Sequence, residues 1–160
     1  MTAWFQKTVS LTAKRRGCHL KLTPSPAQIP ELREFKIGLA HFLLQHTSAS
    51  LAHSCLLFLG PHVDPDVRVD MEMMLNRIAP ENAPYTHTME GSDDMPAHVK
   101  SSLMGVSINV PITNGKLALG TWQGIWLGEH RDRGGSRTYV TLFFSCLRQE
   151  GAGELNVRRY

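Results

Sequence analysis

The sequence lacks any long hydrophobic segment. Among its 160 residues, Cys55–Leu59 is one of the longest apolar runs, far below the roughly 18 residues that a membrane-spanning helix needs. The start of the chain, Met1–Lys7, also lacks an apolar core of the kind found in signal peptides, because Gln6 and Lys7 interrupt it. We therefore expect a soluble protein with no membrane partner that is not exported.

Cysteine is scarce. The three cysteines, Cys18, Cys55 and Cys146, form no CxxC pair. An odd number of unpaired positions disfavours both a disulfide framework and a metal site built from thiolates. We expect reduced thiols and a cytoplasmic location.

A large charge excess is absent too, since 17 basic residues face 14 acidic ones and the net charge is +3. This imbalance is too small to predict a nucleic-acid-binding surface, although small anionic ligands remain possible. The chain contains no P-loop, no GxGxxG and no GxSxG motif, so nucleotide-binding folds and the usual serine hydrolase turn have no support. A serine, histidine and aspartate arrangement is not excluded.

What is present suits one packed domain, because 42% of the residues are hydrophobic and the length fits a single core. We place this domain at residues 1–148 and a polar tail at 149–160. Near its start, residues 4–23 are rich in β-branched and aromatic residues, which predicts a β-hairpin around a basic turn, Lys14–Gly17, that we interpret as solvated. Residues 37–45 are nearly all apolar and predict a strand covered on both faces.

Two helices and a second hairpin follow. Apolar residues at helical spacing predict a helix over residues 67–78, introduced by Asp64 and Pro65. A shorter helix is predicted from Asp94, a possible N-cap, to about Met104. Alternating residues on both sides of Asn114-Gly115 predict a hairpin over residues 106–127, and residues 139–147 predict a further strand.

Eight histidines suggest a metal site, because neutral imidazole is a common ligand for zinc and similar ions. His46, His87 and His98 stand out, since each lies in a predicted loop or at an element end among small polar residues. Acidic residues that could assist them are Glu90, Asp93 and Asp94. The simpler interpretations stay open: isolated histidines usually satisfy local hydrogen bonds, an exposed Glu90 would lack the burial that favours a general base, and capping alone explains Asp94.

Several motifs occur together in one order between residues 46 and 124, and the resemblance that they support covers about residues 4–147. They are His46-Thr-Ser-Ala-Ser-Leu51, Asp64-Pro-Asp66, Tyr85-Thr-His87, Glu90-Gly91, Asp94-Met-Pro-Ala-His98-Val-Lys100, Pro111-Ile-Thr-Asn-Gly115 and Leu119-Gly-Thr-Trp-Gln-Gly124. In these motifs the chain resembles the YjbQ-like family, also called secondary thiamine-phosphate synthase enzymes.

The resemblance implies an α+β fold dominated by a β-sandwich, with one main amphipathic helix and a short second helix. It also implies a homotrimer and a divalent metal ion, for which zinc is the expected identity. The ligands that the motifs match are His46, His87 and His98, the same residues that the local patterns indicate.

The activity implied by the resemblance is a transferase reaction that joins a pyrimidine pyrophosphate to a thiazole phosphate. The substrate would then be a small phosphorylated molecule. Departing pyrophosphate needs positive charge, which the metal with Lys100 or Arg137 could supply. Glu90 or Asp94 would assist as the catalytic carboxylate.

One segment departs from the family pattern. Residues 52–63 replace a shorter family segment that carries acidic and amide residues. If a missing glutamate is catalytic, the chain could be a trimeric binding protein with impaired catalysis. A third possibility is metal-assisted hydrolysis of a phosphate ester, which would use the same ligands with water as the acceptor.

Overall fold

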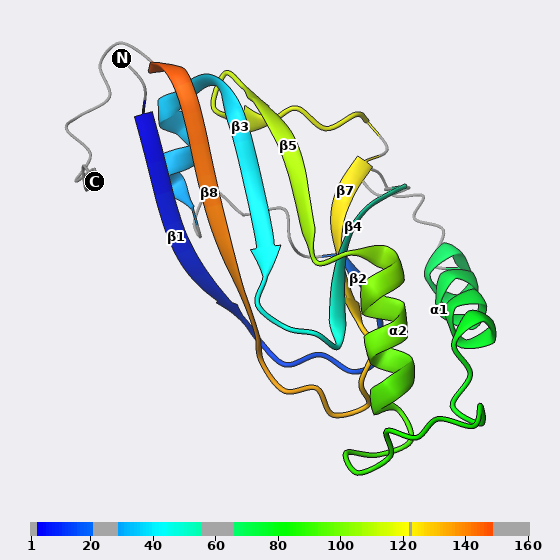
Figure 1. The fold of residues 1–160 in the computed structure, drawn as a ribbon. Helices are drawn as coiled ribbons and strands as arrows, with labels where there is room; N and C mark the ends of the chain where they lie inside the picture. The colour runs from blue at the N-terminus through cyan, green and yellow to red at the C-terminus, as the bar shows by residue number, and fades with distance from the viewer. Residues whose placement is uncertain (1–2, 21–28, 56–65, 122, 149–160) are drawn as a thin grey trace.

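The computed structural model describes residues 3–20, 29–55, 66–121 and 123–148. In these residues the strands form two antiparallel sheets (Figure 1). The large sheet has the order β1 (Ala3–Leu11), β8 (Arg137–Arg148), β3 (Phe35–Leu44), β5 (Ser107–Thr113), β6 (Lys116–Leu117). The small sheet has the order β2 (Gly17–Leu20), β7 (Gln123–Glu129), β4 (Ala49–Cys55). A short 3-10 helix, η1 (Pro30–Glu34), precedes β3.

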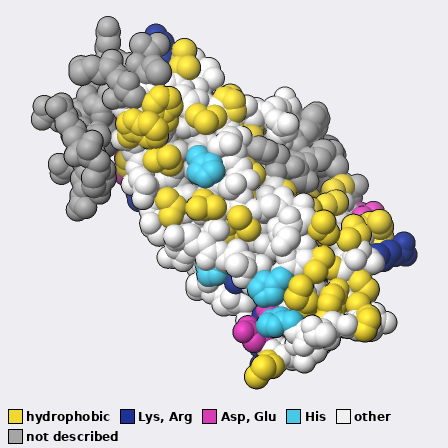
Figure 2. All heavy atoms as spheres, in the orientation of Figure 1, with side chains coloured by type: hydrophobic (Ala, Val, Ile, Leu, Met, Phe, Trp, Pro, Cys, Tyr) yellow, Lys and Arg dark blue, Asp and Glu magenta, His cyan; other side chains and the backbone are white. Residues whose placement is uncertain are grey.

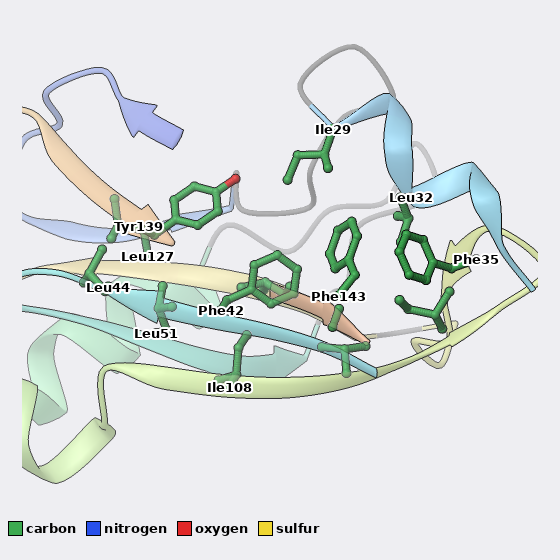
Figure 3. Close-up of a cluster of buried hydrophobic side chains, with 14 of the residues drawn as sticks. Ile29, Leu32, Phe35, Phe42, Leu44, Leu51, Ile108, Leu127, Tyr139 and Phe143 are labelled. Atoms are coloured by element: carbon green, nitrogen blue, oxygen red, sulfur yellow. The ribbon is translucent and has the colours of Figure 1, made fainter. Parts of the chain in front are cut away.

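The main core lies between the two sheets. Phe42 and Phe143 from the large sheet are fully buried in one cluster with Leu51 and Leu127 from the small sheet (Figure 3). The Phe143 ring meets the rings of Phe35 and Phe42 edge to face, at centroid distances of 5.6 and 6.5 Å, an arrangement that aromatic quadrupoles favour. The predicted α+β fold with a β-sandwich core is confirmed.

The helices α1 (Asp66–Ile78) and α2 (Asp94–Met104) cover the other face of the small sheet (Figure 1). Leu75 of α1 packs against Cys18 and Trp126 of the sheet. Ser101 of α2 donates a hydrogen bond to the Ala49 carbonyl at 2.7 Å. Both predicted helices are confirmed, and neither is long and apolar enough to cross a membrane.

The first predicted hairpin is wrong. β1 pairs with β8 in the large sheet, whereas β2 pairs with β7 in the small sheet. The basic turn between β1 and β2 is also not simply solvated, because Arg16 donates hydrogen bonds to Glu72 at 3.1 Å and to Asn76 at 2.6 Å on α1. The turn therefore carries the chain from one sheet to the other and fixes α1.

The second predicted hairpin is confirmed only around its turn. Asn114 and Gly115 have φ values of 50° and 74°, as a type I′ turn requires. The return strand β6 ends after Leu117, and the following strand, β7, belongs to the small sheet. The alternating pattern predicts one return strand, whereas the structure divides these residues between two sheets.

β3 is covered on one face only. Ile37, Leu39 and Leu43 are 56%, 40% and 39% exposed in the single chain, so one chain alone does not bury this strand on both faces as predicted. The apolar run arises because the outer face of this strand also carries aliphatic side chains.

Some predictions concern residues outside the part of the chain that the structure describes. They are the start of the first helix at Asp64-Pro65, most of the unusual segment 52–63 and the tail 149–160.

Candidate metal centre

Three loops meet at one end of the sandwich. They follow β3, precede α2 and follow β7, and Figure 1 shows all three at the lower end of the molecule. These loops, with the first turn of α2, carry the polar side chains that the sequence patterns single out. Strand and helix ends suit such a site, because their backbone is fixed while their side chains are not needed in the core.

His87, Asp94 and His98 form a cluster whose three possible ligand atoms lie within 4.8 Å of one another. The Oδ2 atom of Asp94 lies 2.7 Å from His87 Nε2 and 3.3 Å from His98 Nε2. Asp94 and His98 are four residues apart on α2, so they share one face of the helix. His87 comes from the preceding loop and completes the cluster.

The ring of His98 is oriented by the loop after β3. Its Nδ1 donates a hydrogen bond to the Thr47 carbonyl at 2.9 Å, which leaves the Nε2 lone pair directed at the cluster. The Asp94 side chain is 2% exposed, while His87 and His98 are 44% and 31% exposed. Histidine and acidic side chains accordingly meet on the surface at this end of the molecule (Figure 2).

The donor set fits a divalent cation. Two neutral imidazole nitrogens and one carboxylate oxygen are a ligand set used by catalytic zinc, and similar sets hold other first-row metals. The histidines are partly exposed, so water or a substrate could reach an ion held there. Such an ion could polarise a phosphoryl oxygen or activate a bound water.

His46 lies with another group. Its Nε2 accepts a hydrogen bond from the Thr138 backbone N–H at 2.9 Å, and its Nδ1 is 3.4 Å from Arg137 Nη1. Burial and then the Arg137 charge lower the pKa of His46, against an opposing effect of Glu129. The structure therefore brings together two of the three predicted histidine ligands, with Asp94 as their neighbour.

Arg137 is held by Glu129. Its Nε and Nη2 donate to the two carboxylate oxygens of Glu129 at 2.6 and 2.5 Å, and Nη2 also donates to Ser48 at 3.2 Å. Both charged side chains are buried. The guanidinium thus has its charge matched inside the protein, and its Nη1 atom faces His46.

Lys100 lies on α2 two residues after His98, so it points to a different side of the helix. Its side chain is fully buried, and Nζ donates to Asn76 of α1 at 2.5 Å and lies 4.0 Å from Glu72. Burial, followed by the Arg16 charge, lowers the pKa of Lys100. In this arrangement Lys100 joins the two helices.

The two predicted catalytic carboxylates differ in environment. The Glu90 side chain is 68% exposed and lies 4.0 Å from Arg131 Nη1. Asp94 is buried in the cluster, while the N-cap position of α2 belongs to Asp93, which makes no side-chain capping bond. Helix capping therefore does not explain Asp94.

Sequence reasoning missed Arg131. This residue follows β7 and pairs with both Asp93 and Asp94. Burial alone would raise the pKa of Asp93, but hydrogen bonds from Asp132 N–H and Arg131 lower it. The sequence does contain one signal for Arg131: like His46, it is a polar residue that directly follows an apolar strand, the position where site residues are expected.

A second buried pair lies near β7. Ser50 Oγ and His130 Nε2 are 2.9 Å apart, and both residues are buried. Burial, with Lys100, Arg16 and Arg137 adding to it, lowers the pKa of His130 to about 3. This ring is therefore neutral at physiological pH.

The fold and the cluster define the class: a two-sheet α+β protein with a candidate cation centre of two histidines and an aspartate. Residues 7–145 match the family described as UPF0047 protein YjbQ-like, and the chain belongs to that family. It is 50% identical to the UPF0047 protein YjbQ of Escherichia coli O157:H7 and 48% identical to that of Salmonella typhimurium. Each alignment covers 86% of this chain and 95% of the relative.

Solved structures agree. An uncharacterized conserved protein of the yjbq/upf0047 family from Clostridium acetobutylicum superposes with a TM-score of 0.70 at 30% identity, covering 86% of this chain and 98% of that one. A conserved hypothetical protein from Thermus thermophilus gives a TM-score of 0.67 at 25% identity, covering 84% and 97%. None of these names states an activity.

Proposed function

We propose that the protein is a metal-dependent enzyme whose divalent cation is bound by His87, Asp94 and His98. The observation that carries this proposal is the convergence of two imidazole nitrogens on one oxygen of a buried carboxylate. An isolated buried carboxylate is costly unless it is paired, and a cation shared with the histidines would compensate it further. Zinc is the metal we expect first.

The reaction we propose is the transfer that the family resemblance implies, in which a pyrimidine pyrophosphate is joined to a thiazole phosphate. When bound, the cation would supply positive charge for the departing pyrophosphate. Lys100 and Arg137, predicted to help, are buried in pairs with other groups. Their contribution to substrate binding stays a prediction, and the exposed Glu90 stays a candidate for proton transfer.

Metal-assisted hydrolysis of a phosphate ester is the second candidate. The same partly exposed histidines support it, because a water on the cation would serve as the nucleophile. The two reactions are separated by the products: a condensed product for transfer, and inorganic phosphate released from a simple ester for hydrolysis. If the protein binds metal but catalyses neither the transfer nor the hydrolysis, it would be the binding protein with impaired catalysis that the unusual segment 52–63 suggests.

Metal binding is the first test. Purified protein is freed of metal with a chelator, titrated with Zn²⁺, and the bound metal is measured after dialysis. We expect one ion per chain. Loss of a residue that only hydrogen-bonds to a metal ligand weakens metal binding by about 10- to 100-fold. Because His87 and His98 are proposed to bind the ion directly, His87→Ala and His98→Ala should each weaken Zn²⁺ binding by more than this.

The matched controls are two other histidines. His41→Ala removes a ring that contacts Asn109 at 2.8 Å, and it should leave Zn²⁺ binding unchanged. His46→Ala tests whether His46 is a ligand. Zn²⁺ binding should weaken in this variant if the ion is held by the three histidines, and it should stay unchanged if the ion is held by His87, Asp94 and His98. Unchanged Zn²⁺ affinity in both His87→Ala and His98→Ala would reject the site.

The homotrimer implied by the resemblance is also a proposal. Exposed apolar side chains on the outer face of the large sheet support a subunit contact: Trp4 is 50% and Ile37 56% exposed. Figure 2 shows apolar side chains gathered over this part of the surface. Light scattering should give three times the chain mass, and Leu39→Asp should lower it. The cytoplasmic location expected from reduced cysteines stays a prediction.

A further inference from the structure

Arg131 links the end of β7 to the loop that precedes α2. Its Nε donates to Asp93 Oδ2 at 3.0 Å, its Nη2 donates to the Glu90 carbonyl at 2.6 Å, and its Nη1 donates to Asp94 Oδ1. The side chain is 18% exposed. All three guanidinium nitrogens are therefore used by the end of this loop and by Asp94, the cluster residue that begins α2.

These contacts divide the two oxygens of Asp94 between different partners. Oδ1 pairs with Arg131, while Oδ2 faces His87 Nε2 at 2.7 Å and His98 Nε2 at 3.3 Å. A carboxylate can give a cation one oxygen or both. With Oδ1 held in an ion pair, only Oδ2 is available.

We propose that Arg131 is a positioning residue that makes Asp94 a one-oxygen ligand, so that the cation keeps open positions for water and substrate. This inference rests on the proposed function. A catalytic metal requires such open positions, and a carboxylate bound through both oxygens would fill one of them. Arg131 thus favours a catalytic site over a closed structural one.

The base of this arrangement is rigid. The Arg131 backbone N–H donates to Glu129 Oε1 at 3.0 Å, and Glu129 is fixed by Arg137. The next backbone N–H, of Asp132, donates to Asp93 Oδ2 at 2.9 Å. Arg131 therefore approaches Asp94 from a strand end that is anchored in the core.

An arginine is required because three acceptors in different directions are held at once. Lysine keeps the positive charge but has one nitrogen and no planar fork. In Arg131→Lys, Asp94 Oδ1 is consequently no longer held apart from the cation site, while the positive charge next to it remains. This separates positioning from a purely electrostatic effect.

The experiment uses Co²⁺, whose visible absorption weakens as its coordination number rises. Metal-free wild-type protein, Arg131→Lys and a control, Arg133→Lys, are titrated with Co²⁺, and the spectrum and affinity are recorded. Arg133 is an exposed arginine of the same loop. We expect Arg131→Lys to lose absorption intensity and to bind Co²⁺ about 10-fold more weakly, while Arg133→Lys matches the wild type.

Thermal unfolding of the metal-free variants checks that they fold. If Arg131→Lys does not fold, Asp93→Asn replaces it, because this change weakens one anchor of Arg131 without touching Asp94. It should give the same spectral change to a smaller extent. A folded variant with the wild-type spectrum and affinity would overturn the inference alone, whereas a wild-type protein that binds no Co²⁺ would overturn the proposed function and the inference with it.

Discussion

The buried pair of Glu129 and Arg137 supports both His46 and Arg131, and its removal should be costly. Glu129→Gln keeps the size and shape of the side chain but removes its charge. The Glu129 side chain is 0% exposed and that of Arg137 6% exposed. The change therefore leaves a guanidinium in the interior with no opposite charge on its Nε and Nη2 atoms.

The expected magnitude follows from this burial. Breaking a buried ion pair by removing one partner costs about 3 to 5 kcal/mol, because the remaining charge is neither hydrated nor paired. For a chain of this size each kcal/mol lowers the melting temperature by about 2 to 4 °C. Glu129→Gln should therefore lower it by about 6 to 20 °C.

The free energy of unfolding is measured by urea unfolding at pH 7, monitored by circular dichroism, and thermal unfolding gives the melting temperature. Glu31→Gln is the matched control, since Glu31 pairs with Lys7 at 3.5 Å and both side chains are partly exposed. It should cost less than about 1 kcal/mol. Equal stability losses in the two variants would refute the reasoning about buried charge.

Two further predictions concern the buried face of β7. Gly128→Ala would place a Cβ 2.5 Å from Ser50 Oγ and 2.8 Å from His130 Cε1, so it should cost about 1 to 3 kcal/mol in unfolding free energy, and adding Ser50→Gly should restore part of the loss. Burial is the largest cause that lowers the pKa of His130 from 6.5 to about 3. As the pH falls, the His130 ring is therefore protonated in the unfolded chain before it is protonated in the folded one. Wild-type stability should then fall with pH below about 6.5, by at most about 1.4 kcal/mol per unit, and less steeply in His130→Asn; parallel pH profiles would contradict this.

Much of the fold could be predicted from local patterns. The two helices follow from apolar residues at helical spacing, and the tight turn follows from Asn114-Gly115 with its positive φ values. Sheet assignment could not be predicted in this way. Strands that are neighbours in sequence, such as β1 and β2, join different sheets, and their partners are set by packing between distant segments.

The candidate site was predictable in part. Loop position and residue type singled out His87 and His98, and the structure places them beside Asp94. For Asp94 the sequence alone cannot separate a ligand from a helix cap, because the start of a predicted helix suits both roles. Arg131 could not be paired with Asp94 from the sequence, since 37 residues separate them and only the folded chain brings them together.

The most direct test of the account is a crystal structure of the zinc-loaded protein with anomalous data collected at the zinc absorption edge. We predict one peak per chain, about 2.1 Å from the Nε2 atoms of His87 and His98 and from Oδ2 of Asp94. A zinc peak bound to His46 in place of Asp94, or no peak beside His87 and His98, would contradict the proposed centre.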